Sequence, residues 1–237
     1  MSVATARPTV TPDSSAAQNP SRADGYLGAF VSPLTSKELF LAAEGSYFTA
    51  CSPTPGTGVI GHAAPTTFDE AKPYFLCYNG SSLNLYPQFL HLYETVASVG
   101  GTRVQLTQTI DNGNRYSSAG TAMTVNNTNM YSSNSGALVA CYQGAVVATA
   151  ASGSRRLLGN TVFRGGVIDI IQDFYQLVWG APDGTSSVGS RVATVGEFSR
   201  VCPPVCVGPG QSLMLTQWVG SQSTGPTWEV LFGFVLR

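Results

Sequence analysis

The residue types that most often carry out catalysis are scarce in this sequence. There are two histidines, His62 and His91, and His91 stands three residues before Glu94 in a segment that we expect to be helical, so the two side chains would meet. Asp169 and Asp173 lie four positions apart in an expected strand, where both would face the same side, as a paired-carboxylate glycosidase site requires. A solvated strand face is the more common origin of such a pair.

The sequence motifs of common nucleophiles and phosphate sites are absent. There is no G-x-S-x-G turn and no H-E-x-x-H, and neither Lys37 nor Lys72 follows a glycine, as the lysine of a phosphate-binding loop must. The sequence therefore predicts a protein that is not an enzyme, with no catalytic, cofactor-binding or metal-ligating residues.

Five cysteines are present, which is an odd number and too few, with two histidines, to favour a structural zinc site. We interpret them as free and mostly buried thiols. Cys202 and Cys206, separated by Pro-Pro-Val, are the best candidates for a disulfide. The cysteines are Cys51, Cys77, Cys141, Cys202 and Cys206.

Aromatic and basic residues offer a few binding sites. Trp179, Trp218 and Trp228 would stack on sugars or bases if they were exposed, although tryptophans more often fill a β-sandwich core or an interface. Arg155-Arg156 follows a run of small residues, which indicates an exposed loop. Two glycosylation sequons, Asn79-Gly80-Ser81 and Asn126-Asn127-Thr128, fall in expected turns, and we attribute them to chance.

Charge is low throughout the chain. Of 237 residues only 11% are charged and the net charge is −1, whereas an ordinary soluble domain has roughly 25% charged residues. This argues against a basic nucleic-acid binder and favours self-association. The few charges, among them Asp111 and Arg115, are expected in loops and at strand ends, where they would meet water or a partner.

The element pattern begins with a segment that cannot form a core. Residues 1–35 are interrupted by prolines and rich in small polar residues, so we expect an extended N-terminal arm followed by one domain at 36–237. Residues 37–49 have a strand-like pattern. Pro87 opens the one expected helix, because apolar residues recur at i, i+3, i+4 and i+7, and Gly100-Gly101 would end it.

The rest of the chain is expected to be β-structure. About nine strands are separated by turns rich in Gly, Pro and Ser, a spacing typical of sandwiches and barrels. No apolar run is long enough to span a membrane, and residues 1–20 lack the apolar centre of a signal peptide. The expected strands after residue 49 lie at 73–78, 102–110, 119–125, 137–149, 167–178, 191–201, 211–219 and 227–236.

The order of these elements resembles that of the coat proteins of picorna-like icosahedral viruses. The resemblance lies in four segments: the expected helix and strand at 89–106, the strand region at 167–179, the strand at 212–218 and the closing strand at 228–235. It implies an all-β, eight-stranded jelly roll, which is an antiparallel β-sandwich, with one short inserted helix and an extended N-terminal arm.

The resemblance also implies a function. The chain would be a structural capsid protein that self-assembles with copies of itself, with sister coat proteins, or with both, into an icosahedral virion shell enclosing the genome. It would be made in the host cytoplasm, contact the genome at most weakly, carry no membrane span and meet a host receptor that the sequence does not identify. There are two alternatives. One is a carbohydrate-binding or adhesin-type β-sandwich that uses an exposed Trp179, Trp218 or Trp228. The other is a jelly-roll enzyme built around His62, His91 and the carboxylates.

Overall fold

The computed structural model describes residues 37–63, 66–97, 99–100, 103–134, 138–151, 154–165, 174–180, 197–218 and 222–237. The chain divides into two units, Met1–Phe40 and Leu41–Arg237. The expected arm at residues 1–35 lies outside the described residues, as do Asp169 and Asp173, so these predictions stay predictions. The β-structure discussed below belongs to the second unit.

The described residues form one α-helix and a succession of strands, which confirms the all-β class. The elements are α1 (Lys37–Ala43), β1 (Tyr47–Cys51), β2 (Val59–Ile60), β3 (Phe75–Asn79), β4 (Leu85–Val96), β5 (Val99–Gly100), β6 (Arg103–Asp111), β7 (Tyr116–Ala122), β8 (Thr124–Asn127), β9 (Val139–Ala148), β10 (Arg156–Gly165), β11 (Phe174–Trp179), β12 (Glu197–Cys202), β13 (Ser212–Trp218), β14 (Gln222–Thr224) and β15 (Thr227–Leu236).

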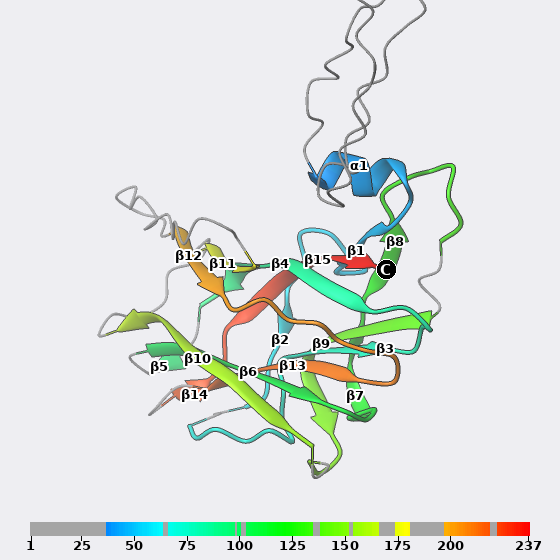
Figure 1. Cartoon of the computed structure of the whole chain (residues 1–237). Helices are drawn as coiled ribbons and strands as arrows, with labels where there is room; N and C mark the ends of the chain where they lie inside the picture. The colour runs from blue at the N-terminus through cyan, green and yellow to red at the C-terminus, as the bar shows by residue number, and fades with distance from the viewer. Residues whose placement is uncertain are drawn as a thin grey trace, which may run out of the picture. The chain divides into compact units, whose positions relative to one another are not determined.

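The strands form two large sheets, which Figure 1 shows as two layers. One sheet has the order β12-β11-β4-β15-β1-β8, with β2 added on β15, and the other has the order β10-β6-β13-β3-β9-β7. The strands pair antiparallel in both sheets, except that β11 and β12 are parallel. A small third sheet pairs β14 with β5.

The main core lies between the two large sheets. Along β15 the buried side chains alternate from Trp228 to Phe232, as expected for a strand with one face on a core, and every residue from Phe232 to Leu236 is buried. Phe232 of β15 meets Phe75 of β3 in the opposite sheet, with ring centroids 5.0 Å apart. Trp228 likewise meets Tyr74 edge-on at 4.9 Å. The arrangement is therefore a sandwich-like packing of two antiparallel-rich sheets.

The segment between β2 and β3 packs on the outer face of the six-stranded sheet. Nε2 of His62 donates to the carbonyl oxygen of Val146 on β9 at 2.6 Å. The backbone of Ala71 accepts a hydrogen bond from Ala148 of the same strand at 2.9 Å. Beneath this segment lies a second, smaller apolar cluster of Leu76, Val146, Ala148 and Met214. The six-stranded sheet is thus buried on both faces over much of its area.

The helix expected to begin at Pro87 is wrong, because these residues form β4. Leu85 and Pro87 are buried at alternate positions. After one extra residue, Gln88, the alternation of buried positions continues with Leu90 and Leu92. The register with β15 shows the cause: consecutive residues Gly233 and Phe234 pair with Phe89 and Pro87. Gln88 is therefore the extra residue of a β-bulge, and a bulged alternation imitates a helical period.

The proline is compatible with this strand. At Pro87 β4 pairs with β15 alone, because β11 pairs only with the stretch from Phe89 to Tyr93. The missing backbone N–H of Pro87 therefore removes no hydrogen bond to β11, and the adjacent bulge is a position at which sheets tolerate proline. The short inserted helix of the expected fold is absent here, and the structure replaces it with a central strand.

The expected strand at 37–49 is partly wrong, because α1 precedes β1. Gly45 has a φ of 76° and its backbone N–H donates to the carbonyl of Ala42, so it ends the helix in the left-handed conformation that favours glycine. Leu41 is the buried residue of α1, in a small cluster with Tyr47 and Val235. The apolar Leu39 and Phe40 are exposed, so the strand-like alternation was a coincidence of composition.

Most of the other expected strands are confirmed within the described residues. Those expected at 73–78, 102–110, 137–149, 211–219 and 227–236 correspond to β3, β6, β9, β13 and β15. The strands expected at 167–178 and 191–201 are described only in part, and their described parts are β11 and β12. The expected strand at 119–125 is instead divided between β7 and β8, and β10 begins at Arg156, where a loop was expected.

Candidate functional site

The histidines and carboxylates do not form the predicted helical pair. His91 and Glu94 both lie on β4, where a separation of three residues places them on opposite faces, and Glu94 is on the buried side. His62 lies in the segment between β2 and β3, against the backbone of β9 in the other sheet. The two histidines therefore have different surroundings.

His91 is packed as an aromatic side chain. Its ring stacks on Phe89 at 4.4 Å and meets Phe174 of β11 edge-on at 5.0 Å. Nε2 of His91 lies 3.0 Å from the amide nitrogen of Gln176, which donates to it when that ring nitrogen carries no proton. Burial lowers the pKa of His91, which favours the same neutral form. The site thus holds a neutral imidazole in an aromatic row.

Two of the three tryptophans are core residues. Trp179 and Trp228 are buried, and Nε1 of Trp179 donates to Oε1 of Gln108 at 3.0 Å inside the sandwich. Trp218 is half-buried and donates to Oγ1 of Thr107 at 2.8 Å. The carbohydrate-binding alternative needs at least one exposed tryptophan, and of the three only Trp218 has partial exposure.

All five cysteines are free, so no disulfide joins Cys202 and Cys206. Cys202 is buried, and burial raises the pKa of its thiol although Gln108 donates a hydrogen bond to the sulfur. Burial likewise raises the pKa of Cys141, with a further contribution from Cys77 beside it. Cys206 is exposed. The interpretation of mostly buried free thiols agrees with these positions.

The first sequon has a structural role. Asn79 is completely buried, and its Nδ2 donates to the carbonyls of Leu83 at 2.8 Å and Val207 at 2.9 Å. Its Oδ1 accepts from the hydroxyl of Ser81 at 2.6 Å. This side chain joins two loops, so it has no surface to offer a glycan. Asn126 of the second sequon is exposed.

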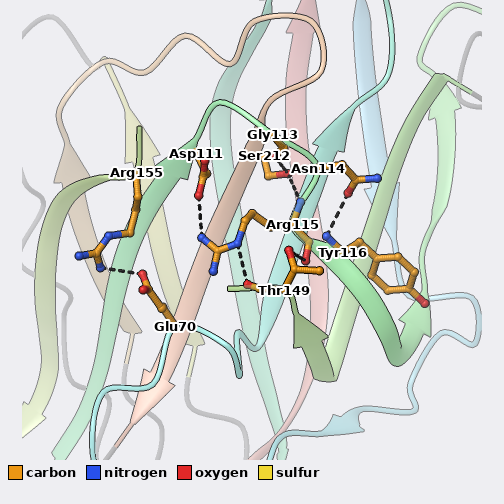
Figure 2. A network of polar contacts seen from close by, with 9 residues as sticks. All are labelled: Glu70, Asp111, Gly113, Asn114, Arg115, Tyr116, Thr149, Arg155 and Ser212. Atoms are coloured by element: carbon orange, nitrogen blue, oxygen red, sulfur yellow. Dashed lines mark hydrogen bonds and ion pairs between the residues drawn. The ribbon is translucent and has the colours of Figure 1, made fainter. Parts of the chain in front are cut away.

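A buried ion pair joins the turn after β6 to its neighbours, as Figure 2 shows. Nη1 of Arg115 lies 2.7 Å from Oδ2 of Asp111, and their side chains are 2% and 0% exposed. Nε of Arg115 donates to the carbonyl of Thr149 at 2.8 Å, and the hydroxyl of Ser212 accepts from the Arg115 backbone N–H at 3.1 Å. Both charges were expected to face water or a partner, and this expectation is wrong: they hold three strands' ends together.

The structure contains an open pocket near this ion pair. It measures about 530 Å³, and we call it the Arg156 pocket after its one cation. Apart from Arg156, the lining contains Asp111, the acidic member of the ion pair, and the hydroxyl of Ser154, together with apolar atoms and amide groups. The lining residues with apolar atoms or amides include Ile110, Asn84, Asn112, Cys206 and Gln211. Within the described parts of the chain, no group of three or more His, Cys, Asp or Glu side chains could hold a metal ion. No described helix is long and apolar enough to cross a membrane.

The most exposed large apolar side chains of the described residues lie together in one loop. Met130 is 93% and Tyr131 101% exposed in the turn at 128–134, between β8 and β9. Sequence reasoning missed this loop, because methionine and tyrosine ordinarily predict burial. The signal that was available is the run Asn126-Asn127-Thr128-Asn129, since asparagines favour tight turns that leave the intervening side chains outside.

Comparisons of the chain with family models, with curated proteins and with solved structures found no match.

Proposed function

We propose that this chain is a jelly-roll coat protein that assembles, with copies of itself, with sister proteins or with both, into an icosahedral shell around a genome. The observation that carries the proposal is the nested pairing of eight strands. In chain order these strands are β1, β3, β4, β6, β10, β11, β13 and β15.

A jelly roll arises when an eight-stranded antiparallel hairpin wraps into two sheets. Its first strand then pairs with the eighth, the second with the seventh, the third with the sixth and the fourth with the fifth. The corresponding pairs here are β1 with β15, β3 with β13, β4 with β11, and β6 with β10. The four pairs join as β11-β4-β15-β1 in one sheet and β10-β6-β13-β3 in the other.

The remaining strands are additions to this pattern, including β2 on β15 and the separate pair of β14 and β5. Strands β7, β8 and β9 lie between β6 and β10 in the chain; β9 and β7 extend the six-stranded sheet beyond β3, and β8 extends the other sheet beyond β1. Strand β12 adds a parallel edge to β11. None of the additions interrupts the eight nested strands. The proposed fold is therefore a jelly roll with an insertion of three strands between its fourth and fifth.

The composition supports assembly as the use of this fold. Obligate assemblies bury about 2,000–5,000 Å² or more per interface, and the centres of such interfaces are depleted in charge. A chain with only 11% charged residues is consistent with such a depletion. Among the described residues, β10 and β8 are the last strands of their sheets on one side, and a neighbouring subunit would cover such edges.

The test is the assembly state of the purified full chain. We expect round particles in negative-stain electron micrographs and a fast-sedimenting species at micromolar concentration. A deletion of residues 1–35 should leave the sandwich folded, with an unchanged circular dichroism spectrum, and should reduce particle yield. A full chain that stays monomeric across salt and pH, alone and with any proteins encoded beside it, would contradict the proposal.

A further inference from the structure

The loop at 128–134, which we call the Met130 loop, presents two large apolar side chains to solvent. Scattered exposed apolar residues are normal on protein surfaces, but an adjacent pair at essentially full exposure marks a contact surface. Tyrosine and methionine are enriched in the centres of interfaces, where tyrosine is often a dominant contact.

The loop is held in this conformation by asparagine side chains. Oδ1 of Asn127 accepts from the backbone N–H of Asn129 at 2.8 Å, and Oδ1 of Asn129 accepts from that of Tyr131 at 2.9 Å. Nδ2 of Asn127 donates to the carbonyl of Gly45 at 2.7 Å, and Nδ2 of Asn129 to that of Ala43 at 2.9 Å. A loop ordered before binding loses less entropy when it binds.

The Arg156 pocket has the chemistry that a tyrosine side chain requires. Ile110 offers an apolar surface and Arg156 a guanidinium group that attracts the face of an aromatic ring. The amides of Asn84, Asn112 and Gln211 can exchange hydrogen bonds with a phenol. A volume of about 530 Å³ accepts a large side chain.

The loop and the pocket lie at the same end of the sandwich, where β15 finishes. Beside the loop, Ser46 accepts a hydrogen bond from Leu236 of β15, next to Gly45, which holds Asn127. Beside the pocket, the backbone of Asn84 exchanges hydrogen bonds with Arg237. When copies are related by rotation about an axis parallel to the sandwich, the loop of one copy and the pocket of the next therefore lie at the same height along that axis.

We infer that the Met130 loop of one copy inserts Tyr131 into the Arg156 pocket of a second copy of this chain, with Met130 covering the rim. The contact is heterologous, joining two different surfaces, so repeated copies form a ring when the rotation closes. A second copy is the favoured occupant because one chain carries both complementary surfaces, and its net charge of −1 gives little repulsion between copies. The inference rests on the proposed function, since it names one contact within the shell.

The first test uses the exposed Cys206 of the pocket. In Tyr131→Cys, a short bis-maleimide linker should join the new thiol to Cys206 of the next copy and give a ladder of covalent oligomers on a denaturing gel. Adding Cys206→Ser should abolish the ladder. Ile60→Cys, an exposed position at the other end of β15, is the matched control and should give no ladder.

The second test measures assembly. Met130→Ser with Tyr131→Ser should lower particle yield by about tenfold or more, as the loss of a central contact does, while Ile60→Ser leaves it unchanged. Wild-type particles with neither a ladder in Tyr131→Cys nor a loss in the double variant would overturn this contact and leave the proposed function standing. A wild-type chain that forms no particles would overturn both.

Discussion

At the scale of single residues, the most consequential arrangement is the buried guanidinium of Arg115. An isolated charge in a protein interior is costly, and pairing it with an opposite charge offsets much of that cost. Asp111 neutralises this cation, and the carbonyl of Thr149 accepts from its Nε. Its Nη2 has no hydrogen-bond partner among the described residues. The pair fixes the turn after β6 against the chain that enters β13, with Ser212 as the link.

We expect Arg115→Met to lower the free energy of unfolding by about 3–5 kcal/mol, because it leaves the carboxylate of Asp111 buried without its cation. Urea unfolding of wild type and variant, followed by circular dichroism at equal protein concentration, measures the difference. Because the pair rather than the charge matters, Arg115→Met combined with Asp111→Leu should recover part of the loss.

Arg155 provides the matched control. It pairs with Glu70 at 2.6 Å, but the two side chains are 35% and 27% exposed, so Arg155→Met should cost only about 0–1 kcal/mol. Equal losses in Arg115→Met and Arg155→Met would show that the buried pair has no special structural role.

At the scale of elements, β4 shows how a central strand differs from its sequence pattern. It pairs with β15 on one side and β11 on the other, and Gln88 bulges out of the ladder. Without Gln88, the inward positions Leu85, Pro87, Leu90 and Leu92 would alternate regularly. The bulge at Gln88 therefore changes which parity faces the core between Pro87 and Leu90; a second register shift occurs near the end of the strand, at Thr95.

Deletion of Gln88 should be tolerated, with a soluble, folded product, because every other side chain of β4 keeps its face. Deletion of His91, three residues later, should abolish folding, because it turns Leu92 and Glu94 to the outer face. The measurement is soluble yield and the urea midpoint of the two variants. Equal damage from both deletions is the result expected of a helix, and it would contradict the strand.

The same reasoning explains which elements the sequence predicts. The strands β3, β6 and β15 follow from short apolar runs or clean alternation, because each has a continuous stretch facing the core. Strand β10 does not, since its register with β6 shifts at two places, between Leu157 and Gly159 and between Val162 and Arg164. To predict helix α1 from the sequence, one must recognise that Gly45 ends it. The spacing between Leu41 and Gly45 is compatible with that interpretation.

The candidate contact surface was harder to predict than the fold. The types of Met130 and Tyr131 indicate burial, and only the tertiary hydrogen bonds of Asn127 and Asn129 turn them outward. The Arg156 pocket brings together residues from four separate parts of the chain, which no local pattern relates. Conversely, the prediction of core positions is confirmed for Trp179 and Trp228, because large aromatic side chains bury the most apolar area.

At the scale of the whole molecule, the low charge has a measurable consequence for assembly. Contacts between ionised groups weaken as salt screens them, and at about 1 M salt the screening length falls to about 3 Å. With 12 basic and 13 acidic residues in 237, few contacts between copies can depend on such pairs. Apolar and neutral hydrogen-bonded contacts remain.

We therefore expect particles of the full chain to persist, with unchanged sedimentation, when sodium chloride is raised from about 0.1 M to about 1 M. The particles should instead dissociate in low concentrations of urea, which weakens apolar and peptide contacts. Dissociation by salt alone would mean that a few ion pairs between copies control assembly, and it would contradict this account.

The pairing of β1 with β15 also governs the order of events during synthesis. Tyr47 is opposite Val235, so the first strand of the sandwich has no β15 partner until nearly all of the intervening chain exists. Contacts between such distant parts of a sequence form slowly, because the loop between them must first be closed. Until β15 has been synthesised, the edges of β1 and β4 with which it will pair have no β15 partner and can form wrong pairings. A copy whose synthesis stops early lacks the middle of its sheet and cannot fold into the sandwich.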